Sequence, residues 1–432
     1  MASLTYSLFR AQISTFSALS HSNFRLYFAG QLISVSGTWV QTVAQGWLVF
    51  HLTHSELYLG LVALAAGIPA LLVTPFAGVI VERNSRRSIL IATQAMQMAL
   101  ALTLALLTFA NLIRVEHVIL LACILGITQA FDAPARQAFV KDMVGPESLA
   151  SGISMNSMMF NTARIFGPTI AGIVLASVGP AWCFLLNALS FLAVLGSLLM
   201  MNMPVVVRRI TNSSPFTQLL EGLRFSRTHE TIKPLLLLSA VMSILCVNIV
   251  TLLPSYADTV LHSPIEGYAT ISTAQGVGAV CAGFLAVLVS RFGRGRVVCA
   301  MSLLLCLSVL IVSRITTVIP AAILMAIVGF SLILMFVTMN TMIQTVVPDQ
   351  FRGRVLSLYT LTFFGLAPFG ALALGYIASE IGVPNALALY AIVNGALAIA
   401  ILARWPALWQ NKRLMVGEQL SAAHQVAEFA PK

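Results

Sequence analysis

The side chains that could do chemistry are the few charged residues inside long apolar stretches. Asp132 and Arg136 lie four residues apart, which places them one helical turn apart on the same face. Arg164 is the only basic residue far from the ends of an apolar stretch. A charge at the centre of a bilayer costs about 3 kcal/mol or more, so such residues need partners or mark a functional path. Asp132 is the candidate for proton transfer. Arg164 either binds or couples a solute in a cavity, or makes a hydrogen bond between helices.

Sequence patterns typical of enzymes are absent. The chain contains no G-x-x-x-x-G-K phosphate loop, no H-E-x-x-H and no G-x-S-x-G. The six cysteines form no C-x-x-C pair, and the seven histidines lie at the ends of the apolar stretches or outside them. An enzyme would need acid, base or metal-binding groups clustered inside these stretches, where only Asp132 and Arg164 are available. We therefore expect no catalytic residue, no metal site and no cofactor.

Polar residues also follow one face of the first apolar stretch. They recur at spacings of 3, 4, 3 and 4, and are Gln31, Ser34, Thr38, Gln41 and Gln45. A polar stripe facing lipid would be unfavourable, so it faces a neighbouring helix or a watery cavity, and we favour the cavity. Asn340 and Gln344 form a similar pair, matched across the cavity by Asn248 and Thr251. We expect all of these residues, with Arg164, to line a substrate cavity.

The elements that must position these side chains are membrane helices. Of the 432 residues, 59% are hydrophobic and 9% charged, whereas a soluble protein carries about 25% charged residues. A bilayer core about 30 Å thick needs roughly 20 apolar residues per helix, and stretches of this length are too long for strands. We therefore predict an all-α membrane protein. Its twelve transmembrane helices are expected at 25–49, 58–81, 89–110, 117–139, 153–177, 182–203, 234–253, 268–290, 297–313, 320–347, 356–379 and 386–403.

The positions of the basic residues predict the orientation of these helices. Of the 24 Lys and Arg residues, 21 lie in the N-terminal segment, in the connections after even-numbered helices or in the C-terminal tail. The connections after odd-numbered helices contain only Arg114 and Arg314. Because basic residues concentrate on the cytoplasmic side, both termini are expected in the cytoplasm and the protein in the inner membrane. This distribution also explains the net charge of +10 without a nucleic-acid partner.

The chain divides into two similar halves. A long polar connection lies between the sixth and seventh helices, and the run that begins at Gln137 resembles the one that begins at Gln344. Parallel repeats of this kind are typical of secondary transporters, whose binding site lies between the repeats. The expected parts are a cytoplasmic N-terminus (1–23), an N-terminal six-helix bundle (24–203), a cytoplasmic loop (204–233), a C-terminal six-helix bundle (234–403) and a cytoplasmic tail (404–432).

Several motifs resemble those of the major facilitator superfamily. The run GVIVERNSRR is similar to the cytoplasmic-loop signature G-x-x-x-D-R-x-G-R-R of that superfamily, with a glutamate for the aspartate and a serine for the second glycine. Its matching residues are Gly78, Glu82, Arg83, Arg86 and Arg87. The runs FDAPARQAFV, NTARIFGPTIAG, FLLNALSF and PDQFRGRVLS resemble the branch that contains the enterobactin exporter and macrolide-efflux proteins. The resemblance covers roughly residues 20 to 403 and implies two six-helix bundles that work by alternating access.

The resemblance also implies roles for individual residues. Glu82 would lie at the N-terminus of the eleventh helix, near Leu356, where the helix dipole favours a carboxylate. Arg86 would pair with Asp132, and both contacts would hold the cytoplasmic side shut, with Arg83, Arg87 and Arg136 completing this gate. Gly167, Pro168 and Gly172 resemble a fifth-helix signature associated with exporters, in which small residues let helices approach closely.

The sequence therefore predicts a secondary active exporter of a small amphipathic molecule, such as a siderophore or a drug. The expected partners are this solute, the lipid bilayer and a proton carried by Asp132. An importer or facilitator is the alternative within transport, and a non-transporting scaffold or a membrane enzyme lies outside it. The proton could instead be carried by Glu56, Asp258 or Glu380 near the outer mouth, which would make Asp132 purely structural.

Overall fold

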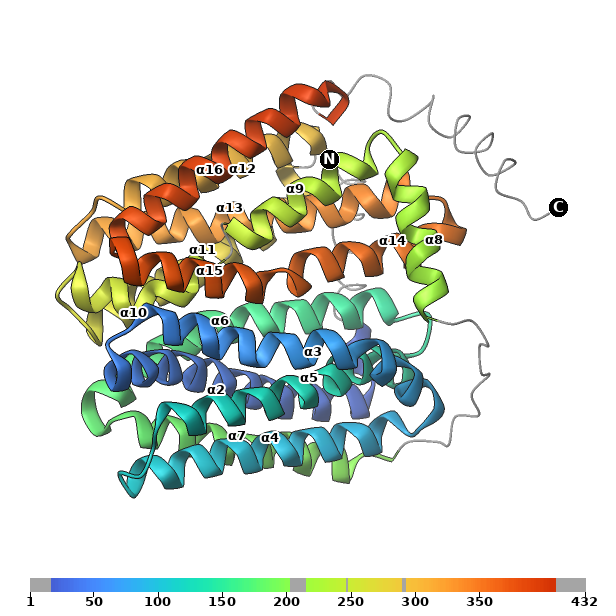
Figure 1. Cartoon of the computed structure of the whole chain (residues 1–432). Coiled ribbons are helices and arrows are strands. Elements are labelled where there is room, and N and C mark those ends of the chain that lie inside the picture. The colour runs from blue at the N-terminus through green and yellow to red at the C-terminus, as the bar shows by residue number, and fades with distance from the viewer. Residues whose placement is uncertain (1–16, 203–214, 246–247, 290–292, 409–432) are drawn as a thin grey trace, which may run out of the picture.

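A computed structural model of the chain describes residues 17–202, 215–245, 248–289 and 293–408, and these residues are nearly all helical (Figure 1). The first part contains η1 (Ser17–Ser20), α2 (Ser22–Thr53), α3 (Glu56–Arg83), α4 (Arg86–Phe109), α5 (Val115–Val144), α6 (Leu149–Val178) and α7 (Pro180–Met200). The second part contains α8 (Pro215–Thr228), α9 (Ile232–Leu245), α10 (Ile249–Thr259), α11 (Glu266–Val289), α12 (Arg294–Val312), α13 (Val318–Val346), α14 (Asp349–Thr360), η3 (Leu361–Gly365), α15 (Ala367–Ile381), α16 (Val383–Arg404) and η4 (Pro406–Leu408).

Among the described residues, eleven helical segments are long and apolar enough to cross a membrane. They correspond to the predicted spans from the second to the twelfth. The first predicted span is a helix of 32 residues, α2, which is long enough to cross but is not among the eleven. Its glutamines, serines and threonines lower the mean hydropathy, so composition alone does not identify it.

One of the predicted spans changes helix type within the described residues, and another is described in two pieces. The span expected at 356–379 consists of α14, the π-helical segment η3 and α15, with Pro368 in the first turn of α15. Proline has no N–H to donate to the preceding turn, so the regular α-helical hydrogen bonding stops there. The span expected at 234–253 is described in two pieces, α9 and α10. Of the three residues between them, 246–247 lie outside the described part and Asn248 is described.

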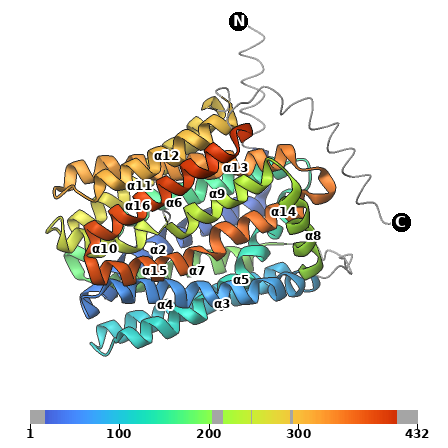
Figure 2. The same cartoon turned by 45° about the horizontal axis from the view of Figure 1, so that its top comes forward.

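The helices form two groups that meet along a narrow seam (Figures 1 and 2). Helices α2 to α7 pack mainly against one another, and so do α9 to α16. The groups touch chiefly where α3 packs on α15 and where α6 packs on α11. Small residues permit the first crossing, since a Cβ atom on Gly60 would lie 2.6 Å from the carbonyl oxygen of Ala371.

We call one end of the molecule the basic end and the other the opposite end. The basic end carries α8 and the turn between α3 and α4, at the right of Figure 1. The opposite end carries the α2–α3, α6–α7 and α15–α16 turns. Two of these turns have the same local structure. In each, a glycine with positive φ precedes a helix that has proline in its first turn. The glycines are Gly179 (φ 90°) and Gly382 (φ 80°), 203 residues apart.

The buried cores of the two groups merge only at the opposite end. The large core cluster of the second group includes residues of the first group from the C-terminal half of α2, the start of α3 and the end of α6. These include Val43, Leu48, Leu59, Ala171 and Leu175. Towards the basic end the first group has a separate core cluster, built around Phe24, Tyr27, Phe139 and Phe191. The cores of the two groups are therefore continuous at one end of the seam and separate at the other.

Helix α8 is attached to the second group. The Phe225 and Phe351 rings stack at 4.7 Å, and Glu221 pairs with Arg354 of α14 at 2.8 Å. At the end of α8, Nδ1 of the buried His229 accepts hydrogen bonds from the backbone N–H groups of Thr231 (3.2 Å) and Ile232 (3.4 Å). The histidine thus caps the start of α9. Burial lowers the pKa of His229 below its usual value, and nearby Glu230 opposes this shift.

Acidification should weaken this corner. The pKa of His229 is lower in the folded chain than in the unfolded chain. The contribution of neutral His229 to folding stability is therefore fully present above the unfolded pKa of about 6.5 and is lost as the pH falls through the folded pKa. The apparent melting temperature of the purified protein should therefore fall between pH 7.5 and 5. His229→Gln should reduce this fall, since glutamine offers an acceptor that does not titrate, whereas His262→Gln, at an exposed position, should not. Equal pH dependence in all three proteins would contradict the assignment.

Candidate functional site

Asp132 lies at the centre of a buried polar cluster in the first group. Its side chain on α5 is 1% exposed, and its Oδ1 atom accepts hydrogen bonds from Thr93 Oγ1 (2.9 Å) and Gln94 Nε2 (2.7 Å) of α4. Arg136, one turn later on α5, reaches Oδ2 at 2.7 Å. Three side chains therefore contact the buried carboxylate.

Arg86 does not pair with Asp132, contrary to the expectation from the family signature. It pairs with Asp142 at 2.5 Å and donates a hydrogen bond to the Ala138 carbonyl oxygen at 3.0 Å. The reason is depth. Arg86 begins α4 at the basic end, beside the last turns of α5, where Asp142 lies. Asp132 lies ten residues before Asp142 on α5, which is about 15 Å along the helix axis. Arg136, on the same helix as Asp132, takes the place expected for Arg86.

The other gate residues lie at the basic end. Glu82 and Arg83 are exposed. Two residues at the start of α14, 349 and 350, have side chains outside the described part, so the expected cap by Glu82 stays a prediction. Gly78 has open space around it. Arg87 has a role that sequence reasoning missed, because it donates to the carbonyl oxygens at the end of α7, those of Leu198 (2.7 Å) and Leu199 (3.0 Å).

The polar stripe of α2 faces the interior of the first group. Gln31 and Ser34 are buried, while Thr38, Gln41 and Gln45 line a narrow pocket of about 30 Å³ between α2, α4, α5 and α7. Gln41 Oε1 accepts a hydrogen bond from Asn187 Nδ2 at 2.7 Å, and Gln97 of α4 lies in the same pocket. This space holds one or two water molecules rather than a solute. The stripe is therefore placed at a neighbour-helix contact and not in a wide cavity between the halves.

The polar pairs of the second half do not come together. Asn248 donates to the carbonyl oxygens of Ser243 (2.8 Å) and Ile244 (3.1 Å) at the break between α9 and α10. Gln344 donates to Asn340 within α13. No hydrogen bond joins the two pairs within the described ranges, and Thr251 is half-buried. Asn248 and Gln344 thus each bond to groups of their own predicted span.

The exporter-like residues of α6 permit two close crossings. A Cβ atom on Gly167 would collide with Trp39 of α2, and one on Gly172 would collide with Ala269 of α11. Pro168 follows Gly167 inside the helix. The spacing of small residues on this helix therefore reflects its packing between α2 in its own group and α11 in the other.

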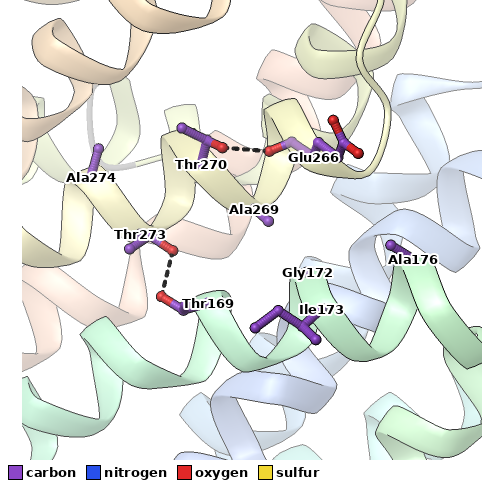
Figure 3. Close-up of a pocket in the computed structure, with 9 residues that line it drawn as sticks. All are labelled: Thr169, Gly172, Ile173, Ala176, Glu266, Ala269, Thr270, Thr273 and Ala274. Carbon is purple, nitrogen blue, oxygen red and sulfur yellow. Dashed lines mark hydrogen bonds between the residues drawn. The ribbon is translucent and has the colours of Figure 1, made fainter.

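A pocket of about 570 Å³ lies at the crossing of α6 and α11, and sequence reasoning did not predict it. It is lined by Thr169, Gly172, Ile173, Ala176, Glu266, Ala269, Thr270, Thr273 and Ala274 (Figure 3). Thr169 and Thr273 join the two groups through a hydrogen bond of 3.0 Å. The spacing of Glu266, Thr270 and Thr273 by four and three residues places them on one face of α11 and could have indicated a polar surface there. The opposite wall of the pocket, on α6, is identified only by the structure.

A second hydrogen bond crosses the seam at the opposite end. Ser255 Oγ of α10 donates to Glu56 Oε1 of α3 at 2.6 Å. Of the three acids considered as alternative proton carriers, Glu56 is therefore the one whose side chain links the two groups in a described hydrogen bond. Asp258 is half-buried and Glu380 is exposed.

The family comparison covers almost the whole chain. A family described as transmembrane secretion effector matches residues 13–424. The staphyloferrin A transporter of Staphylococcus aureus is 25% identical over 85% of this chain and 92% of its own length. The enterobactin exporter of Salmonella choleraesuis is 25% identical over 82% of this chain and 86% of its own length. The nucleoside transporter NupG has a similar fold, with a TM-score of 0.73 and 13% identity over 90% of this chain and all of that chain.

Charge reversal can distinguish the two possible partners of Arg86. Arg86→Asp alone should place two carboxylates together and lower the amount of folded protein in the membrane. Combining it with Asp142→Arg should restore most of that amount, because the pair is re-formed with opposite polarity. Combining it with Asp132→Arg should lower the amount of folded protein further, since Arg136 then faces a second arginine. Recovery by the Asp132 combination, measured as detergent-soluble protein and melting temperature, would reinstate the expected pairing.

Proposed function

Because the chain belongs to the transmembrane secretion effector family of the major facilitator superfamily, we propose that it is a proton-coupled exporter of a small amphipathic molecule. The solute would be a siderophore, a drug or a compound of similar character. Twelve transmembrane helices in two six-helix bundles, 24–203 and 234–403, would alternately expose a site between them. Both termini (1–23 and 404–432) and the 204–233 loop would lie in the cytoplasm, with the protein in the inner membrane.

One observation carries the proposal: the two groups share a core at the opposite end and keep separate cores towards the basic end. Packed interiors have discrete arrangements rather than continuous ones, so a seam that is packed at one end and parted at the other is what one state of a rocking transporter requires. With the basic end in the cytoplasm, this state is open inward.

Export is favoured over import by two further observations. Gly172 of the exporter-like motif packs α6 against α11, a helix of the other group, so this part of the motif lies at the seam. The enterobactin relative is named as an exporter. Neither observation favours a scaffold or an enzyme.

Asp132 would carry the proton. In this state its carboxylate has three donors, from α4 and α5, so the charged form is satisfied without help from the second group. Protonation would release Arg136 and weaken this buried cluster, which is the coupling that a proton-driven exporter needs. Glu56 remains the alternative carrier because its protonation would alter the hydrogen bond to Ser255.

Proton coupling can be tested in proteoliposomes containing trapped pyranine. Ethidium, a fluoroquinolone, a macrolide and aromatic carboxylates would be added in turn under an imposed pH gradient. At least one should be accumulated against its gradient by the wild type, with a matching change in internal pH that an uncoupler abolishes. Asp132→Asn should retain downhill exchange and lose accumulation at least tenfold, while Asp142→Asn should keep it. Accumulation that ignores the pH gradient would refute proton coupling. Normal accumulation by Asp132→Asn would leave Glu56 as the carrier.

The closed end of the seam offers a second prediction. A Cβ atom on Gly60 would lie 2.6 Å from the Ala371 carbonyl oxygen and 2.8 Å from the Leu372 Cα atom, and these backbone atoms cannot yield. Gly60→Val should therefore prevent α3 and α15 from meeting and reduce transport at least tenfold.

Labelling can show whether the seam itself has opened. In a cysteine-free chain, Ser255→Cys, at a buried position, should react slowly with a membrane-impermeant thiol reagent and much faster when Gly60→Val is added. Gly196→Val is the matched control, because no atom lies within 4 Å of a Cβ at that position. Unchanged labelling in the Gly60 variant would show that this crossing does not close the seam.

A further inference from the structure

Arg164 is a positive charge near the middle of a membrane-crossing helix. It lies in the candidate span Ser151–Val178, far from both ends. A charge at this depth is expensive unless a partner or water compensates it. The side chain is half-buried, so it is neither sealed in a core nor free in solvent.

The described partners of Arg164 do not neutralise it. Its guanidinium carbon lies 5.2 Å from the centre of the Trp39 ring on α2, and no ion pair or side-chain hydrogen bond to it occurs within the described ranges. Arg136 differs in this respect. It stacks over Phe160, one turn earlier on α6, at 4.9 Å, and is also paired with Asp132. The corner between α2, α5 and α6 thus holds two arginines and one carboxylate, which leaves one positive charge without a counter-charge.

The uncompensated charge lies at the seam. A Cβ atom on Gly276 of α11 would lie 2.6 Å from the Arg164 carbonyl oxygen, so the backbones of the two groups touch at this level. The Thr169–Thr273 hydrogen bond follows little more than one turn further along α6. A solute held by Arg164 would therefore lie where one group moves past the other.

We propose that Arg164 and Trp39 form a receptor for an organic anion, and that the exported solute carries a carboxylate next to an aromatic or other planar apolar part. The guanidinium fork binds a carboxylate through two parallel hydrogen bonds, and the indole face offers stacking area for the planar part. A cationic solute would be repelled by the remaining charge. This inference names the solute class for the function proposed above and rests on it for transport, but not for binding.

Binding can be measured on the full chain in detergent with Trp39 as the sole tryptophan, the other four being replaced by phenylalanine. The probe is 4-iodobenzoate, whose iodine quenches indole fluorescence, and its uncharged match is 4-iodobenzamide. The acid should quench Trp39 saturably and the amide should not. Arg164→Gln should raise the Kd for the acid at least tenfold, and Arg164→Lys, which keeps the charge but loses the guanidinium fork, should raise it by a smaller factor. Arg114→Gln, at an exposed position of the opposite end, is the control and should leave the Kd unchanged.

Three results would each overturn the inference: no saturable quenching by the acid, equal binding of the amide, or an unchanged Kd in Arg164→Gln. Transport is scored separately in the pyranine proteoliposomes. Arg164-dependent binding without pH-driven accumulation of any compound would reject the exporter and keep the anion receptor. Accumulation of neutral or cationic compounds that Arg164→Gln leaves intact would keep the exporter and reject the receptor.

Discussion

The contact between the two helix groups at the opposite end is the constraint on which the rest of this structure depends. It consists of backbone-to-backbone crossings, α3 on α15 and α6 on α11, which need glycine or alanine at the point of contact. Two hydrogen bonds, Glu56 with Ser255 and Thr169 with Thr273, accompany them. The small residues let the helix backbones meet at these crossings, and the apolar core that the two groups share surrounds them.

The first group, by contrast, is tied together internally by buried polar contacts. Asp132 and its donors join α5 to α4, the Gln41–Asn187 hydrogen bond joins α2 to α7, and all four helices line one narrow pocket. In a medium without water such contacts are costly to break one at a time, so these four helices are expected to move as one body. A rigid group beside a separable seam is the combination that alternating access needs.

Sequence reasoning recovered the helices well because hydropathy over twenty residues is a strong local signal, and it recovered the polar face of α2 because spacing fixes a face. It did not recover which neighbour that face meets, since periodicity carries no information about the partner. Arg86 shows the same limit: a motif identified the residue, but the ten-residue difference in depth between Asp132 and Asp142 decided its partner. The α6–α11 pocket needs walls from both halves and has no local signature. α2 was predicted as a span, yet composition alone does not support it, because the residues that line the internal pocket make it polar.

The docking of α8 on α14 has a consequence for the order in which the chain is made. Phe351 follows Phe225 by 126 residues, so the partner that holds α8 leaves the ribosome long after α8 itself. At about 5–20 residues per second, this delay is roughly 6–25 s. The residues that fasten the first group, from Gln41 to Asn187, are all synthesised before α8. The first group can therefore fold before α8 docks. The stacking of Phe225 on Phe351 is then a late step of biogenesis, because it requires that α14 has been synthesised.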